Sequence, residues 1–283
     1  MRRSLVVGLS LFTLAAMFIS ALDSCAQDNK TLIRVRGSDS VAGRVDQLSK
    51  IYVKDHPDVN VVVLGGAKTI GLPFLIDKSG ELAMAARRAT DQERREAGDR
   101  GIELVEKLIG YGGIAVIVDQ ENPVSELTVE QLQKILKGDF NRWDQVGGSA
   151  EPVTVFSVGD IHQGTIHFLE NDFLGKTPIT KKAEVVSSFD TVMRRVAETK
   201  GSIGFTRMRD ALESPVSQQV QFKILKLKQT ADSPAIFPSR KAIAGGSYPL
   251  KRPFFLYYDS KVDSSVKGFV DFIVGKGWGA QKL

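Results

Sequence analysis

The sequence LIRVRGSDSVAGRVDQLSKIYVKDHPDVNVVVLGG, residues 32–66, contains the pattern that decides the fold. Residues 32–36 are typical of a β-strand, and after a polar loop the apolar residues recur at helical spacing until Pro57. A second run, 59–64, is almost uniformly β-branched and apolar, as expected of a strand buried on both faces of a parallel sheet. Strand, loop, helix and strand in this order predict a crossover unit of an α/β sheet.

The same order of elements recurs along the chain, with further strands predicted at 82–86, 113–118, 153–158, 201–206 and 220–227. Capping-box patterns at 90–93 and 128–131 predict the starts of two helices. A chain of 283 residues is longer than one modest core needs, so we expect two lobes of mixed sheets flanked by helices. A polar stretch with a proline after 118 predicts the crossing between them. The expected division is a signal peptide at 1–26, a first part of lobe 1 at 27–118, lobe 2 at 119–227 and a return to lobe 1 at 228–283.

The first residues have the features of an export signal. Arg2 and Arg3 precede an uncharged, mostly apolar stretch at 5–21, and small residues at Ser24 and Ala26 offer a cleavage site. We therefore expect an exported protein of the periplasm or cell envelope. Two alternatives remain at this point, an uncleaved membrane anchor and lipidation of Cys25, which would tether the protein.

Composition excludes several functional classes. Hydrophobic residues make up 42% and charged residues 25% of the chain, and the net charge of +5 is not gathered into a basic run with interleaved aromatics. Nucleic-acid binding is therefore not expected, whereas a small anionic ligand is compatible with the charge. Cys25 is the one cysteine, and the spacing of His162 and His167 does not suit a shared metal, so we expect no metal site and no enzyme.

Short loops of Gly, Ser and Thr recur where a strand ends and a helix begins. Backbone N–H groups in such loops lack partners, and the helix dipole adds positive charge there, so an anion can accept several hydrogen bonds at once. Arg87, at the end of a strand, offers a charge-assisted contact. The expected binding residues are Ser38, Asp39, Ser40, Lys68, Thr69, Arg87, Gln163, Gly164 and Thr165.

Each of these residues has a purely structural alternative. Ser38, Asp39 and Ser40 are common helix caps, and Lys68 fits a solvated turn. Arg87 and Arg88 can pair on the surface with Asp91 or Glu93 instead. Several such loops at the carboxyl ends of sheet strands favour the binding interpretation, because open α/β sheets bind ligands there.

Several motifs together resemble one family, the PstS-like phosphate-binding proteins that serve as solute-binding components of ABC transporters. The resemblance extends from about Leu32 to the C-terminus. The motifs are RGSDS at 36–40, ELAMAAR at 81–87, the segment 127–146 with Gly138, Asn141 and Trp143, GSIGF at 201–205, and YPLKRP at 248–253.

The resemblance implies a type II periplasmic-binding-protein fold, with the ligand in a cleft between lobes and held mostly by backbone and hydroxyl donors. It further implies a monomer that needs no cofactor, binds an oxyanion with phosphate favoured, and delivers it to a membrane permease with its ATPase. The second loop, AKTIG at 67–71, departs from the family's Gly-Ser-Gly-Ser-Gly-like pattern, and three single positions depart as well. Ala86 replaces a serine or aspartate, Gly159 an arginine and Gln163 a serine. Lys68 is a candidate replacement for the missing arginine.

Two other functions stay open on the sequence. The departures are compatible with a sensory or accessory binding module that engages a membrane signalling partner. The anion-binding loops are also compatible with an exported phosphate-ester hydrolase, although the sequence shows no pairing of a nucleophile with a base.

Overall fold

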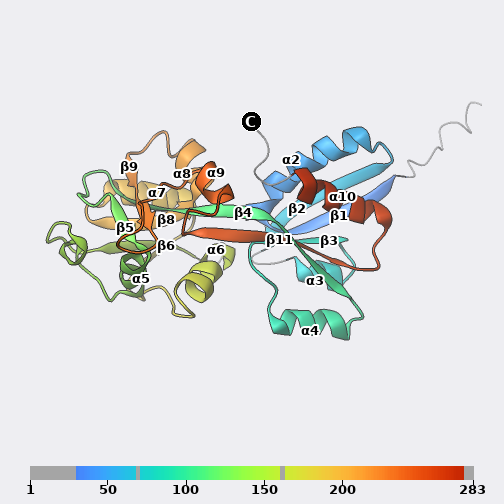
Figure 1. Ribbon diagram of the computed structural model, residues 1–283, viewed down its shortest axis with the longest axis horizontal. Coiled ribbons are helices and arrows are strands. Elements are labelled where there is room, and N and C mark those ends of the chain that lie inside the picture. Colours follow the sequence, from blue (N-terminus) through green and yellow to red (C-terminus); the bar gives the residue numbers. More distant parts are fainter. Residues whose placement is uncertain (1–29, 68–70, 160–162, 277–283) are drawn as a thin grey trace, which may run out of the picture.

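Residues 30–67, 71–159 and 163–276 are described by the computed structural model of the chain. They form two α/β lobes joined by two long strands that pair antiparallel, β4 (Leu104–Asp119) and β11 (Lys251–Asp259) (Figure 1). The two-lobed α/β fold expected from the sequence is confirmed. Within the described ranges, no helix is long and apolar enough to span a membrane. The predicted signal peptide, with Cys25, lies outside these ranges.

Lobe 1 is built on three parallel strands, β2, β1 and β3, with β11 antiparallel to β3. Helices α2 and α10 cover one face through residues such as Leu48 and Phe269, and α3 packs on the other face through Leu72. The elements are β1 (Thr31–Ser38), α2 (Asp39–Asp55), β2 (Val59–Ala67), α3 (Leu72–Ile76), β3 (Leu82–Ala85), α4 (Asp91–Asp99) and α10 (Ser264–Lys276).

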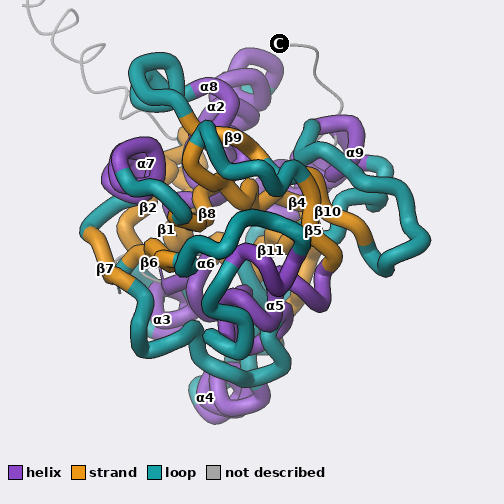
Figure 2. The backbone as a smooth tube through the Cα atoms, turned by 90° about the vertical axis from the view of Figure 1, so that its left-hand side faces the viewer, coloured by secondary structure: helices purple, strands orange, loops and turns teal. Residues whose placement is uncertain are grey.

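Lobe 2 continues the same sheet. The second half of β4 pairs antiparallel with β8 and β9, while β6 lies parallel to β8 and β7 parallel to β6. A view onto lobe 2 shows these strands as a middle layer, with α7 and α8 above it and α5 below it (Figure 2). The strands are β5 (Glu126–Thr128), β6 (Thr154–Val158), β7 (Glu184–Val186), β8 (Ser202–Arg207), β9 (Phe222–Ile224) and β10 (Lys226–Lys228). The helices are α5 (Val129–Lys137), η2 (Trp143–Val146), α6 (Gln163–His167), η4 (Phe168–Phe173), α7 (Phe189–Glu198), α8 (Met208–Glu213) and α9 (Arg240–Ala244).

Two capping boxes predicted from the sequence are present. At α4 the backbone N–H of Glu93 donates to Thr90 Oγ1 at 3.2 Å, and the N–H of Thr90 donates back to Glu93 Oε2 at 2.8 Å. At α5 the corresponding distances between Gln131 and Thr128 are 3.1 and 2.9 Å. Each box satisfies helix-start donors, which is why these short helices begin where the sequence predicts.

Strand β2 differs from its prediction. It is parallel to β1, as expected, but it lies at the edge of the sheet. Residues 61–63 are only half-buried and Leu64 is 43% exposed. The expectation of burial on both faces is wrong, because an edge strand has fewer neighbours to cover its side chains.

The hydrophobic clusters show where the chain passes between the lobes. Ile109 and Phe254 pack in the core of lobe 1, whereas Ile114 and Leu250 pack in the core of lobe 2. β4 therefore contributes to both cores, and the chain enters β11 directly from the core of lobe 2. We propose that the crossings lie inside β4 and at the start of β11, rather than at the boundaries 118/119 and 227/228 expected from the sequence.

Candidate functional site

Segments from both lobes meet around Arg252 of β11. On the lobe 1 side, Ser40 lies in the first turn of α2, and its Oγ accepts a hydrogen bond from Arg252 Nη2 at 2.7 Å. On the lobe 2 side, Thr165 of α6 accepts from Arg252 Nη1 through its Oγ1 at 2.9 Å. A Cβ added to Gly164 would lie 4.0 Å from the same Nη1. Ser40, Gly164, Thr165 and Arg252 are together called the interlobe cluster below.

The cluster lies at the carboxyl ends of parallel strands. β1 ends at Ser38, and β3 ends just before Ala86, whose Cβ would lie 3.6 Å from a Cβ added to Gly164. The amino end of α6 therefore approaches the end of β3 across the lobe boundary. Ligands of open α/β sheets bind at this edge, so the position fits a binding site.

Arg252 is a buried cation whose side-chain hydrogen-bond partners are neutral. The residue is 1% exposed, and within the described part of the chain its guanidinium makes no ion pair and its Nε has no partner. Burial, and then the nearby charge of Arg207, lower the pKa of Arg252 to about 9, against an opposing effect of Asp210. The side chain is therefore still positive at neutral pH. A buried charge without a counter-charge is costly, so an anion bound here would be strongly favoured.

The amino end of α2 adds to this positive field. Ser38 is the N-cap residue of this 17-residue helix and is buried, but its hydroxyl makes no capping hydrogen bond. The first N–H groups of a helix lack partners inside the helix and carry the positive end of its dipole. A helix start next to a buried guanidinium is therefore suited to an oxyanion.

Comparison with known proteins agrees with this geometry. A family model described as a PBP superfamily domain matches residues 24–276. The phosphate-binding protein PstS of Staphylococcus haemolyticus is 30% identical over 244 residues, which cover 83% of this chain and 73% of that protein. The chain belongs to the PstS family of phosphate-binding proteins, within the PBP superfamily.

Solved structures support the same family. An ABC-type phosphate transport receptor from Vibrio cholerae has a TM-score of 0.69 and 28% identity, and the match covers 86% of this chain and 93% of that one. PstS from Borrelia burgdorferi has a TM-score of 0.64 at 23% identity, covers 86% of this chain and 92% of its own, and shows the shared fold. The resemblance to PstS-like proteins inferred from the sequence motifs is confirmed.

The structure brings together some of the residues expected to bind ligand in this PstS-family chain. Ser40, Gly164 and Thr165 meet at Arg252, and Ser38 ends the adjoining strand. Lys68 and Thr69 lie outside the described residues, and of Gln163 only the backbone at the start of α6 is described.

Asp39 directs its carboxylate to the neighbouring turn. Its Oδ1 accepts a hydrogen bond from the backbone N–H of Gly66 at 2.6 Å. A Cβ added to Gly65 would lie 2.2 Å from the same oxygen, so the carboxylate is packed closely against this turn. Asp39 thereby ties the start of α2 to the end of β2, and its own N–H remains the group that suits an anion.

Arg87 has a carboxylate partner, unlike Arg252. Its Nη1 and Nη2 donate to the two carboxylate oxygens of Glu93 at 2.8 and 2.7 Å, and Nη1 also donates to the carbonyl of Arg88. The structural alternative weighed from the sequence, an ion pair with Glu93, is thus present. Because its charge is matched, Arg87 has less need of an anionic ligand than Arg252 has.

Replacement of Glu93 with Gln is expected to destabilise the protein by about 1–3 kcal/mol at pH 7, because it leaves the buried Arg87 without its counter-charge. Burial alone would raise the pKa of Glu93, but hydrogen bonds from Arg87 and Thr90 outweigh it and lower the pKa. The Arg87–Glu93 ion pair therefore stabilises the folded protein fully above about pH 4.3, the ordinary pKa of Glu in an unfolded chain. This stabilisation is lost as the pH falls through the lower pKa of Glu93 in the folded state. Urea unfolding between pH 7 and pH 3 measures it.

The control for this variant is Glu130→Gln, which removes an exposed pair with Lys134 in the first turn of α5, another helix with a capping box. Little change in the urea midpoint is expected there, because exposed pairs stabilise weakly. Equal effects of the two substitutions at pH 7 would show that the Arg87–Glu93 pair stabilises the protein no more than an exposed pair does.

Arg252, at the centre of the interlobe cluster, is absent from the binding residues expected from the sequence, where it is only part of the motif at 248–253. A signal is present, because Arg252 directly precedes the run Pro-Phe-Phe-Leu-Tyr-Tyr of β11, and a charge beside such a run is a candidate for burial.

Proposed function

We propose that the protein captures inorganic phosphate between its lobes for import by an ABC transporter. The observation that carries this proposal is the buried Arg252, whose side-chain partners are two hydroxyls, one from each lobe. The names of the matched relatives, phosphate-binding protein PstS and an ABC-type phosphate transport receptor, support phosphate as the oxyanion.

The hydroxyls of Ser40 and Thr165 are suited to complete the site. Each accepts a hydrogen bond from Arg252, so each keeps its own hydrogen to donate to a phosphate oxygen. The guanidinium and the amino ends of α2 and α6 supply further donors. Because Ser40 and Thr165 belong to different lobes, a phosphate bound to both holds the lobes together, and binding is coupled to closure.

The finer assignments follow from the same proposal. The protein acts as an exported monomer of the periplasm or cell envelope, with no enzymatic step and no cofactor. Its partners are a membrane permease and the attached ATPase. Cys25 as a lipid tether is the alternative to simple cleavage, and mass spectrometry of the exported protein distinguishes the two.

Titration calorimetry of the exported protein with phosphate and with sulfate tests the proposal. We expect one phosphate to bind per chain, with a Kd in the micromolar range or below. The absence of binding heat with phosphate at millimolar concentration would refute the proposed function. Uptake of labelled phosphate by cells that lack the protein, with and without a restored copy, tests the transport role.

Replacement of Thr165 with Val is expected to weaken phosphate binding about tenfold, because it removes one hydroxyl donor, worth about 1–1.5 kcal/mol, and keeps the side-chain shape. Thr206→Val is the matched control. Thr206 is fully buried in β8, and its hydroxyl has no hydrogen-bond partner among the described residues. Calorimetry should therefore show unchanged affinity for Thr206→Val. A loss of the same size in both variants would contradict a specific role for Thr165.

A further inference from the structure

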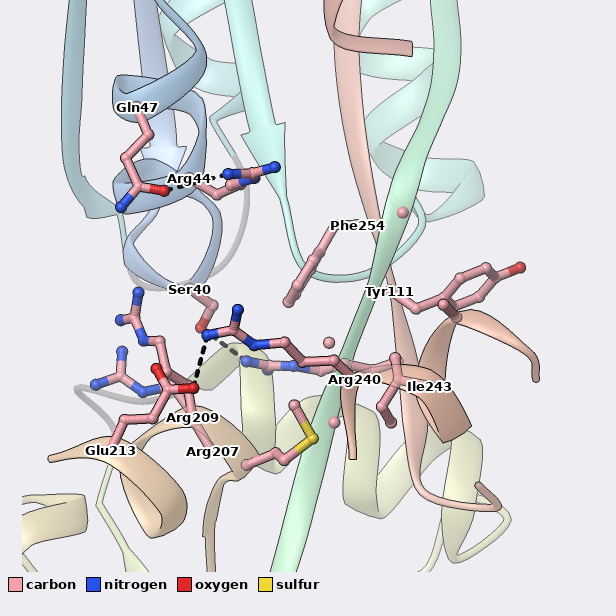
Figure 3. A pocket seen from close by; sticks show the side chains of 16 residues that line it. Ser40, Arg44, Gln47, Tyr111, Arg207, Arg209, Glu213, Arg240, Ile243 and Phe254 are labelled. Atoms are coloured by element: carbon pink, nitrogen blue, oxygen red, sulfur yellow. Dashed lines mark hydrogen bonds and ion pairs between the residues drawn. The ribbon is translucent and has the colours of Figure 1, made fainter. Parts of the chain in front are cut away.

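A second feature of the lobe boundary is a pocket of about 580 Å³ beside the interlobe cluster (Figure 3). One wall is the face of α2 that carries Ser40, Arg44 and Gln47, one and two turns apart. The glycine-rich stretch 110–113 of β4 and part of β11 form another wall, and α8 and α9 of lobe 2 close the opposite side. Residues from both lobes therefore line the pocket.

Positive charge dominates this pocket. Five of its lining residues are arginines, at positions 44, 207, 209, 240 and 252, and Glu213 is the one lining carboxylate among the described residues. Glu213 Oε1 accepts from Arg240 Nη2 at 2.6 Å. Asp210, just outside the lining, pairs with Arg207 and lies 3.9 Å from Arg209 Nε. Even with both carboxylates counted, positive groups remain in excess.

Arginines of lobe 1 and lobe 2 face one another across the lobe boundary. Burial, and then the charge of Arg240 on the other lobe, lower the pKa of Arg44. Arg209 reaches across as well, since a Cβ added to Gly43 of α2 would lie 3.7 Å from its Nη1. Like charges that face one another across the boundary disfavour approach of the lobes unless an anion lies between them.

The volume of the pocket and its apolar lining residues indicate the kind of anion. A volume of about 580 Å³ lies within the roughly 300–1,000 Å³ typical of sites for small organic ligands, and exceeds what one inorganic oxyanion fills. Met208, Ile243 and Phe254 give apolar contact surface among the arginines. The described residues that line it do not include Gly164 and Thr165, although Ser40 and Arg252 belong to both sites.

We propose that this pocket is a second ligand site, which binds a small organic anion with two or more acidic groups, phosphate or carboxylate, and thereby links α2 of lobe 1 to α8 and α9 of lobe 2. Guanidinium groups bind both kinds of acid through paired hydrogen bonds. The site does not depend on phosphate capture, because Arg44, Arg209 and Arg240 lie in the pocket and outside the interlobe cluster.

Titration calorimetry of the exported protein tests this site, with citrate, 3-phosphoglycerate and uncharged glycerol as probes, each with and without saturating inorganic phosphate. Citrate or 3-phosphoglycerate should bind in both conditions, and glycerol should not. Arg44→Gln and Arg240→Gln should each weaken that binding at least about tenfold, since each removes a charge-assisted contact. Phosphate affinity should change less than about threefold in Arg240→Gln.

Arg142→Gln is the control, because it removes an arginine that is exposed, paired with Asp144 and outside the pocket. Failure of both citrate and 3-phosphoglycerate to bind would overturn the proposal, as would equal affinities in Arg240→Gln and Arg142→Gln. Full displacement by phosphate would instead show one continuous site and also overturn it. Loss of phosphate binding alone would count against the proposed function and leave the second site intact.

Discussion

Replacement of Arg252 with Met is expected to reduce phosphate affinity at least about 100-fold while leaving the ligand-free protein as stable as the wild type, or more so. The guanidinium can supply two charge-assisted hydrogen bonds to the anion, each worth about 1.5–3 kcal/mol, and their loss weakens binding accordingly. In the absence of phosphate the same group is a buried charge with neutral side-chain partners, so its removal relieves a desolvation cost.

Calorimetry measures the first effect and thermal unfolding without phosphate measures the second. Ser40→Ala serves as the comparison, because it removes one hydroxyl partner of Arg252 and keeps the charge. A loss of about tenfold is expected for it. If Arg252→Met bound phosphate like the wild type, Arg252 would be a structural residue and the proposed site would be wrong.

Replacement of Gly37 with Ala is expected to cost about 3–5 kcal/mol of folding free energy, a large part of the total stability of a domain. Gly37 has a φ of +145°, and an added Cβ would lie 2.1 Å from the carbonyl oxygen of Met84 in the neighbouring strand β3. The obstacle is backbone, which cannot rotate away, so β1 and β3 must separate next to Ser38.

Urea unfolding of Gly37→Ala beside Gly98→Ala checks this expectation. Gly98 lies in α4 with nothing within 4 Å of an added Cβ, so alanine there should stabilise the helix by up to about 1 kcal/mol. Opposite shifts of the two urea midpoints are expected. A Gly37→Ala midpoint equal to that of the wild type would show that the β1–β3 contact tolerates a side chain.

The local elements of this fold could be predicted because their signals are local. Thr90 and Thr128 each meet their capping partner three residues later, and Pro57 follows the end of α2. Long-range placement was less accessible. The run 220–227, expected to be one strand, is two short strands with Leu225 between them, because β9 pairs with β4 and β10 pairs with β5.

The residues of the candidate site could likewise be predicted only where their sequence signal is local. Ser40, Gly164 and Thr165 were identified because strand–loop–helix junctions carry a recognisable composition. The partner that unites them was not, since Arg252 is 212 residues from Ser40 in the sequence and its burial depends on packing between lobes. Arg87, in contrast, has its carboxylate partner only six residues away, so its ion pair could be anticipated as an alternative.

A crystal structure of the protein grown with phosphate tests the central claim most directly. The predicted result is one phosphate between the lobes, with its oxygens within about 3.2 Å of Arg252 Nη1 or Nη2, Ser40 Oγ and Thr165 Oγ1. A phosphate held away from Arg252, with the guanidinium still bonded only to the two hydroxyls, would contradict it.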